Sequence, residues 1–181
     1  MPFCPRPRLA ALLLLVALPA WADRADRLQP LTIEADKPGL LDLAKQIVVF
    51  NGNVVLTQGT MVVRAERAEV RQTPEGARNA TLTGTPGKPA SFRQKREGLN
   101  ETIEASADRI EYDARSDVLR FVGNASVRRL RGGTPADEIS GQLITYDNRA
   151  EQFNVEGGGS GGRVRAVLIP AAEPPASGAS R

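Results

Sequence analysis

The chain has 181 residues, which is enough for one domain of ordinary size. It contains no histidine and only one cysteine, Cys4, so histidine-based acid–base catalysis, histidine metal sites and a disulfide within the chain are excluded. Hydrophobic residues make up 41% and charged residues 25%, which is too apolar for a wholly disordered protein. Aromatics at 4% and a net charge of +3 argue against a nucleic-acid-binding surface.

Residues 1–22 have the features of an export signal. Arg6 and Arg8 precede the apolar run Leu9–Leu18, and Ala20-Trp21-Ala22 has the small-x-small pattern of a cleavage site. A membrane anchor is the alternative, but a run of about ten apolar residues is half of what spans a bilayer. Loss of Arg6 and Arg8 from the 24 basic residues leaves 22 against 21 acidic ones, a net charge of +1. We expect an exported, nearly neutral protein stabilised without disulfides.

Along the mature chain, apolar residues alternate with the period of two that is typical of half-buried strands. The alternating sets are Val48, Phe50, Val54 and Leu56; Ile110 and Tyr112; Leu119, Phe121, Ala125 and Val127; Ile144 and Tyr146; and Phe153 and Val155. Glycine and proline residues separate these sets, and Gln58-Gly59 is a candidate two-residue hairpin turn. The sequence therefore predicts an all-β protein.

Two stretches, Pro38–Gln46 and Gly59–Arg71, have a composition that also allows a helix. Within the second, Ala65–Glu69 lies between β-branched residues and lacks an apolar face wide enough to pack, so we expect a strand there.

The C-terminal end differs in composition from the rest of the chain. Val164–Ile169 predicts a last strand, and Pro170 ends it. Residues 171–181 are rich in Ala, Pro, Ser and Gly and predict a disordered tail, so residues 23–170 form the expected domain.

Short sequence repeats support a β-structure built from similar units. Ile33-Glu34-Ala35 recurs as Ile103-Glu104-Ala105, and Phe50–Val54 is echoed by Phe121–Ala125, 71 residues later. A shorter echo at a spacing of 34 residues relates Ile110–Gly123 to Ile144–Gly157. These echoes predict strand pairs stacked along an axis, with the glycine inside a strand marking a bend or bulge.

Catalytic motifs are scarce. A serine nucleophile would lack a histidine base, and no motif places Lys37, Lys45, Lys88 or Lys95 near a serine. Paired carboxylates of a glycan hydrolase remain an alternative, although Asp and Glu are scattered over turns and outward strand positions. There is no Asp-rich calcium loop, and the glycine tract 157–162 lacks the Gly-Lys-Ser/Thr of a phosphate loop. We expect no enzymatic activity, no metal and no cofactor.

The aromatic residues of the mature chain allow two interpretations. They are Phe50, Phe92, Tyr112, Phe121, Tyr146 and Phe153. They could fill the core of an ordinary β-sandwich, which composition alone favours. Alternatively, two sheets could part at one edge and hold an acyl chain, with basic residues meeting anionic head groups. The basic candidates are Arg64, Arg67, Arg71, Lys88, Arg93, Lys95 and Arg96.

One family resemblance separates these interpretations. The segments that carry it are Gln29–Asp36, Phe50–Thr60, Ala65-Glu66, Gly87–Phe92, Glu104-Ala105 with Tyr112, Phe121–Ala125, Ser140–Tyr146 and Arg163–Pro170. On these segments the chain, over residues 29–170, resembles the OstA-like family of periplasmic lipopolysaccharide-transport proteins. The glycine tract 157–162 and the loop 128–135 are not part of the family pattern.

The resemblance implies a twisted, V-shaped β-jellyroll of antiparallel strands, open at both ends, that is not an enzyme. Members of the family carry lipopolysaccharide across the periplasm with the acyl chains of its lipid A part between the two sheets. They join head to tail, and they bridge an inner-membrane component of the same fold to the N-terminal domain of the outer-membrane translocon. Unpaired first and last strands would suit such joining by strand addition.

The resemblance also implies inward-facing, lipid-binding positions. These are Leu31, Ile33, Phe50, Val54, Phe92, Ile110 and Tyr112, and the aromatic residues Phe121 and Tyr146 of the same stripes complete the set. The alternative, from a different class of protein, is a structural β-repeat scaffold or adhesin-like protein with a dry core.

Overall fold

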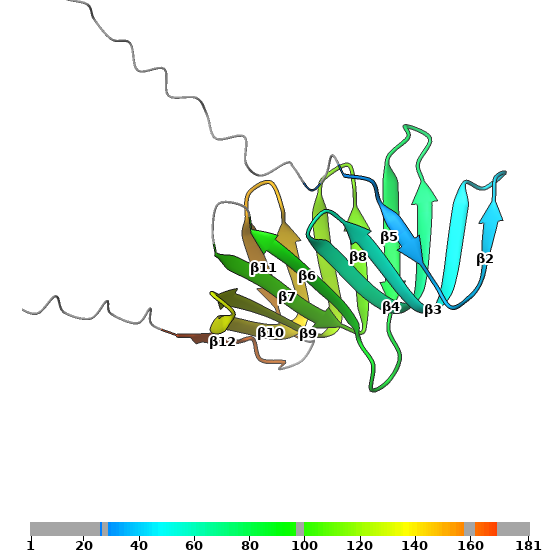
Figure 1. The fold of residues 1–181 in the computed structure, drawn as a ribbon. Coiled ribbons are helices and arrows are strands. Elements are labelled where there is room, and N and C mark those ends of the chain that lie inside the picture. Colours follow the sequence, from blue (N-terminus) through cyan, green and yellow to red (C-terminus); the bar gives the residue numbers. More distant parts are fainter. Residues whose placement is uncertain (1–25, 27–28, 97–99, 158–161, 170–181) are drawn as a thin grey trace, which may run out of the picture.

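Figure 1 shows the computed structural model of the chain, which describes residues 26, 29–96, 100–157 and 162–169. The strands are β1 (Thr32–Glu34), β2 (Lys37–Asp42), β3 (Ile47–Gln58), β4 (Met61–Gln72), β5 (Arg78–Thr83), β6 (Ala90–Arg96), β7 (Glu101–Ala107), β8 (Arg109–Asp113), β9 (Val118–Arg131), β10 (Thr134–Asp147), β11 (Gln152–Glu156) and β12 (Arg165–Leu168). Among the described residues, no helix is long and apolar enough to cross a bilayer. The predicted signal (1–22) and tail (171–181) lie outside the described residues.

The all-β prediction is confirmed, with two local corrections. The helix that Pro38–Gln46 allowed is not formed, because Lys37–Asp42 pairs with β3 as a strand and residues 43–46 form the following turn. The β3–β4 hairpin turn is Gly59-Thr60 rather than Gln58-Gly59, since Gln58 still pairs with Met61. Gly59 supplies the positive φ, +56°, that this tight turn requires.

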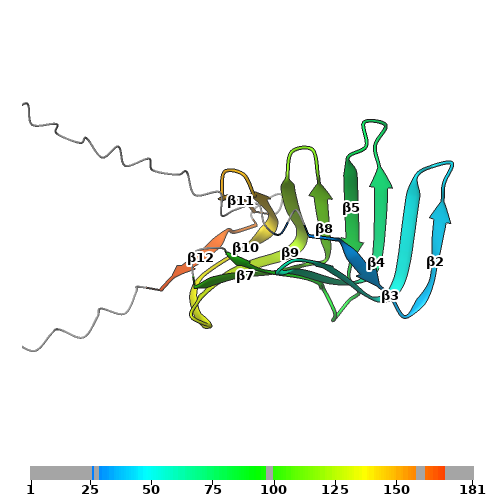
Figure 2. The same cartoon turned by 45° about the horizontal axis from the view of Figure 1, so that its top comes forward.

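All twelve strands belong to one antiparallel sheet that folds back on itself. The long strands β3, β4, β9 and β10 each run through both layers. One half of each long strand pairs in sheet 1, which has the order β2-β3-β4-β5-β8-β9-β10-β11. The other half pairs in sheet 2, with the order β1-β3-β4-β6-β7-β9-β10-β12. Figure 2 shows the two layers meeting along one side and diverging on the other, which is the V-shaped jellyroll.

Glycine–asparagine pairs bend the long strands where they pass from sheet 1 to sheet 2. Gly52-Asn53 in β3 and Gly123-Asn124 in β9 all have positive φ, between 45° and 80°, and the ladder register shifts at both places. Such values suit glycine and are tolerated by asparagine. The prediction that glycine inside these strands marks a bulge is therefore confirmed.

The chain consists of two units with the same pairing scheme, β1–β6 and β7–β12. β3 pairs with β1, β2 and β4 as β9 pairs with β7, β8 and β10, and β4 pairs with β5 and β6 as β10 pairs with β11 and β12. The two units are joined by the pairs β5–β8 and β6–β7. The repeat predicted from Phe50–Val54 and Phe121–Ala125 is thus confirmed.

The sequence repeat of Ile33-Glu34-Ala35 as Ile103-Glu104-Ala105 is out of register with this structural repeat. Ile33 pairs with Leu56 and Ala105 pairs with Val127, and Leu56 and Val127 are 71 residues apart. Ile33 therefore corresponds to Ala105, not to Ile103.

The core lies where the sheets meet. Its largest fully buried side chains come from both sheets: Phe92, Phe121, Ile110, Ile144 and Val54. Phe92 and Phe121 pack edge to face, with ring centroids 5.9 Å apart and planes at 68°. Full burial of each such side chain stabilises the fold by about 1.5–3 kcal/mol.

Three hairpin turns of sheet 1 share one design. Asp42, Asp113 and Asp147 each accept a backbone hydrogen bond from the residue three positions later, Lys45, Ser116 and Ala150, at 3.0, 3.4 and 2.9 Å. Each turn ends on a non-glycine residue with positive φ: Gln46 at 54°, Asp117 at 61° and Glu151 at 53°. Aspartate is well suited to start such turns because its side chain can replace a backbone acceptor.

Candidate functional site: an apolar groove with two chambers

Two cavities open between the sheets, an N-terminal one lined by both units and a C-terminal one lined mainly by the second unit. The N-terminal chamber has a volume of about 240 Å³. Its apolar lining comes from strands of both sheets: Leu31, Leu56, Met61, Val63, Val70, Ala80, Leu82, Ile110, Tyr112 and Leu119.

The predicted lipid-binding residues divide into lining and base. Leu31, Ile110 and Tyr112 line the N-terminal chamber, and Tyr146 lines the second cavity. Val54, Phe92 and Phe121 are fully or almost fully buried and form the base of the V, where they fix the angle between the sheets. Ile33 and Phe50 are half-buried and pack against the core from its margin.

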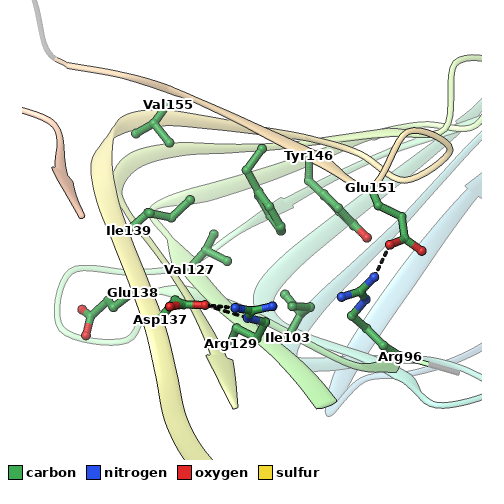
Figure 3. A pocket seen from close by; sticks show the side chains of 11 residues that line it. Arg96, Ile103, Val127, Arg129, Asp137, Glu138, Ile139, Tyr146, Glu151 and Val155 are labelled. Atoms are coloured by element: carbon green, nitrogen blue, oxygen red, sulfur yellow. Dashed lines mark hydrogen bonds and ion pairs between the residues drawn. The ribbon is translucent and has the colours of Figure 1, made fainter. Parts of the chain in front are cut away.

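The C-terminal chamber has a volume of about 340 Å³ (Figure 3). One wall is formed by β6, β7, β9 and the first half of β10 in sheet 2, and the other by the second half of β10 and β11 in sheet 1. Its apolar floor consists of Ile103, Val127, Ile139, Tyr146, Phe153 and Val155. Tyr146 and Phe153 stack with ring centroids 4.3 Å apart and planes at 13°. The two stacked rings therefore give this chamber a flat aromatic surface.

A network of ion pairs lines the C-terminal chamber. Arg129 donates to Asp137 through Nε at 2.7 Å, and its Nη1 lies 3.5 Å from Glu101. Arg96 Nη1 donates to Glu101 at 3.0 Å, while its Nη2 donates to Glu151 across the V, as Figure 3 shows. The Glu101 side chain is only 10% exposed, so these contacts hold a half-buried network of charges together.

No sequence pattern indicated this network. Of the seven basic candidates, all described by the structure, only Arg96 lines either chamber. Arg67 and Arg71 instead pair with Glu69, and Arg93 pairs with Glu104 outside the groove. The signal for Arg96 was present, because it shares the parity of Ala90 and Phe92 on an alternating strand.

Asp26 anchors the N-terminal segment at the mouth of the N-terminal chamber. Its carboxylate accepts hydrogen bonds from the Thr60 amide at 2.9 Å, the Thr60 hydroxyl at 2.6 Å and Gln94 Nε2 at 3.2 Å. Partial burial raises the pKa of Asp26, but the three hydrogen bonds from Thr60 and Gln94 together outweigh it and lower the pKa below its ordinary value. The ionised carboxylate therefore ties the segment to the β3–β4 turn and to β6.

Within residues 26, 29–96, 100–157 and 162–169, no cluster of three His, Cys, Asp or Glu side chains could hold a metal ion.

The ends of the sheets expose strand edges and apolar side chains. In the described part of the chain, β1 and β2 pair only with β3, and β11 and β12 pair only with β10. Leu40 and Leu41 of β2 are 62% and 60% exposed, and Leu168 of β12 is 75% exposed. Exposed edges of this kind are surfaces for strand addition.

Comparisons with known proteins settle the family. The pattern of the family described as "LptA/(LptD N-terminal domain) LPS transport protein" matches residues 32–152. The chain belongs to this family. It is 31% identical to "Lipopolysaccharide export system protein LptA" of Haemophilus influenzae over 160 residues, covering 88% of each chain. It is equally identical to the Escherichia coli K12 protein of the same name over 162 residues, covering 90% of this chain and 83% of that one.

The fold of this member of the LptA/LptD N-terminal-domain family also matches a solved structure. A crystal structure titled as LptH, the LptA-homologous periplasmic component of the lipopolysaccharide transport device from Pseudomonas aeruginosa, superposes with a TM-score of 0.69 at 26% identity. The match covers 80% of this chain and 99% of the other. The match to residues 32–152 takes in both bent strands and most of both chambers.

Proposed function

We propose that the chain is a lipopolysaccharide-binding bridge that carries its ligand between the two membranes through the periplasm. The observation that carries this proposal is the pair of partly apolar chambers between the diverging sheets. A groove of this kind can hold acyl chains out of water, which stabilises them by about 0.8 kcal/mol for each buried CH₂ group. The names of the relatives, lipopolysaccharide export system proteins, support the same ligand.

In this proposal the lipid-binding residues are the nine predicted from the sequence, with two roles. The partly accessible residues contact the acyl chains directly: Leu31, Tyr112 and Tyr146, which line the chambers, and Ile33 and Phe50, which pack at the core margin. Ile110, although it borders the N-terminal chamber, is fully buried and belongs with Val54, Phe92 and Phe121 at the base. The buried residues at the base keep the sheets apart at the width that the chains need. Transport of this kind requires no bond to be made or broken by the protein, so no catalytic role is proposed.

We further propose that copies join head to tail, on the pattern of the junction between the two units. Inside the chain β5 pairs with β8 and β6 with β7. By the repeat, β11 corresponds to β5 and β2 to β8, while β12 corresponds to β6 and β1 to β7. The edge β11–β12 of one copy would therefore pair with the edge β2–β1 of the next, and inner- and outer-membrane components of the same fold could take the two ends.

The internal junction also gives the register of the proposed contact. Thr83 pairs with Arg109 inside the chain, and the corresponding contact brings Glu156 of one copy opposite Lys37 of the next. Ser91 pairs with Ser106, and the corresponding contact brings Arg165 opposite Glu34. Both contacts place opposite charges across the seam, and all four of these residues are exposed in the single copy.

Site-specific photo-crosslinking to purified lipopolysaccharide tests the groove. A photoreactive residue at position 112 or 33 should crosslink, because Tyr112 lines the N-terminal chamber and Ile33 packs at the core margin. Position 32 is the control, since Thr32 is exposed on the neighbouring, outward parity. A folded protein that crosslinks from neither inner position would have a closed core, and the structural-scaffold alternative would replace the bridge.

A further inference from the structure

The two chambers occupy equivalent places in the two units. Strand registers relate Leu56 to Val127, Val63 to Ile139 and Leu82 to Val155, and the first member of each pair lines the N-terminal chamber while the second lines the C-terminal one. The two chambers therefore share part of their apolar lining through the repeat, while Ile110, Tyr112 and Leu119 of the second unit complete the N-terminal one.

The polar residues at equivalent places differ. Gln58 and Met61 of the first chamber correspond to Arg129 and Asp137 of the second, which form an ion pair. At the far rim, Arg78 of the first chamber corresponds to Glu151 of the second. Arg78 is the first residue of β5, and Glu151 is the residue just before β11. The first chamber thus has the neutral Gln58 and Met61 where the second has the Arg129–Asp137 ion pair, and its own charged lining residues are Asp26, Arg78 and Asp117.

One ion pair of that rim connects the two sheets. Arg96 comes from the end of β6 in sheet 2, and Glu151 from the β10–β11 turn of sheet 1. Arg96 also contacts Glu101, so it keeps one carboxylate partner if Glu151 leaves. Glu151 is the more exposed partner, at 41% against 25% for Arg96, and it lies on a turn rather than within a strand. An ion pair so placed bridges the two sheets at the chamber and can open without unfolding a strand.

We infer that the C-terminal chamber is a second binding site for an anionic amphiphile, in which an anionic group of the ligand replaces Glu151 at Arg96. This inference rests on the proposed groove but adds a separate site with its own selectivity. The stacked Tyr146 and Phe153 receive the apolar tail. The guanidinium of Arg96 suits a phosphate, which offers several oxygens to its planar donors. The Arg96–Glu151 pair acts as a latch that the ligand opens by exchange.

Tryptophan quenching by brominated amphiphiles reports each chamber separately. Phe153→Trp reports the C-terminal chamber and Tyr112→Trp the N-terminal one, because the single natural tryptophan, Trp21, lies in the expected export signal and is absent from the mature chain. The probes are 12-bromododecyl phosphate and, as a neutral control, 12-bromododecyl maltoside. We expect the phosphate probe to quench both reporters. At position 153, half-quenching should need a maltoside concentration about three to ten times higher than the phosphate concentration. Val155→Trp replaces Phe153→Trp if circular dichroism shows that the latter does not fold.

The latch is tested with Glu151→Gln. Gln46 ends the β2–β3 turn, which has the same aspartate-started design, at φ 54°, against 53° for Glu151, so glutamine fits this backbone. Removing the latch should lower the phosphate probe concentration for half-quenching at position 153 by about threefold to tenfold. Glu75→Gln is the matched control, because its pair with Arg115 connects two turns of the same sheet and crosses no chamber.

The outcomes separate the inference from the proposed function. Quenching at position 112 but at neither C-terminal reporter confines binding to the N-terminal chamber; it overturns the inference and removes Tyr146 from the lipid-binding residues, but leaves the rest of the proposed function standing. Quenching at neither position overturns the groove as well. Equal quenching by both probes at position 153 overturns the anionic selectivity, and an unchanged or weaker response of Glu151→Gln overturns the latch.

Discussion

Gly52 and Gly123 hold the same conformation at the two bends of the molecule, with φ of 77° and 80°. Each accepts a backbone hydrogen bond of 2.9 Å, from Asp36 and Asp108 respectively. The same two aspartates also accept hydrogen bonds from the asparagine that follows each glycine, Asn53 and Asn124. The bend that creates the groove is therefore one local motif used twice.

Gly123→Ala should destabilise the fold by about 1–3 kcal/mol. The added Cβ would strike the Asp108 carboxylate, and alanine is strained at this φ. Urea denaturation measures the change. Gly133→Ala is the control, because its φ is 85° and nothing lies within 4 Å of its added Cβ, so it isolates the backbone strain. An equal loss in both variants would contradict the clash at the bend.

Leu31→Glu should reduce lipopolysaccharide binding by at least about tenfold while leaving the β-structure intact. Leu31 is 37% exposed and lines the N-terminal chamber, where a carboxylate would have to lose water on contact with acyl chains. Leu43→Glu is the matched control, since Leu43 is 78% exposed and lies in the turn after β2. Fluorescent lipopolysaccharide titration gives the affinities, and wild-type affinity in a folded Leu31→Glu protein would remove this residue from the site.

Charge reversal across the proposed seam should act in both directions. Glu156→Lys or Lys37→Glu alone should weaken self-association by about threefold to tenfold, because each single variant places like charges opposite one another. The double variant restores opposite charges and should recover the association. Sedimentation velocity over a range of concentrations measures the association. Lys45→Glu, in the exposed β2–β3 turn, is the control. Singles that associate normally would show that the register differs from that of the internal junction.

The Asp26 anchor should weaken only at acidic pH. Its pKa in the folded protein lies below the ordinary 3.8, so the stabilisation it adds is complete above that value and is lost as pH falls through the lower, folded pKa. The amide proton of Thr60, which donates to Asp26, reports the change by NMR. Its titration midpoint should lie below 3.8, and Asp26→Asn should abolish the inflection. A midpoint at or above 3.8 would contradict the anchor.

The alternating pattern predicted the strands because half-buried strands impose it on every second residue. The glycines inside the strands also predicted the bend, because few residues other than glycine and asparagine tolerate positive φ within a strand. The Gly59-Thr60 turn was displaced by one residue, since Gln58 can pair in the ladder whether or not the turn begins there. The strand at Lys37–Asp42 escaped prediction because it is an edge strand whose exposed leucines do not alternate.

The site was predictable only where apolar residues line it. Tyr112 and Tyr146 were found by parity, but Arg129 and Asp137 were not, because charged residues on a strand normally face water. Their inward placement depends on partners from neighbouring strands, and such long-range pairing leaves no local pattern. The Arg96–Glu151 contact joins residues 55 positions apart on different sheets, so no local sequence pattern indicates it.

The repeat of pairing between β1–β6 and β7–β12 has a consequence for the length of the protein. Each unit ends on the edge that the next unit needs, so whole units could be added or removed without changing either terminal edge. Span and joining chemistry are therefore independent properties. A longer gap between membranes could be matched by more units in one chain or by more chains, with the same seam in both cases.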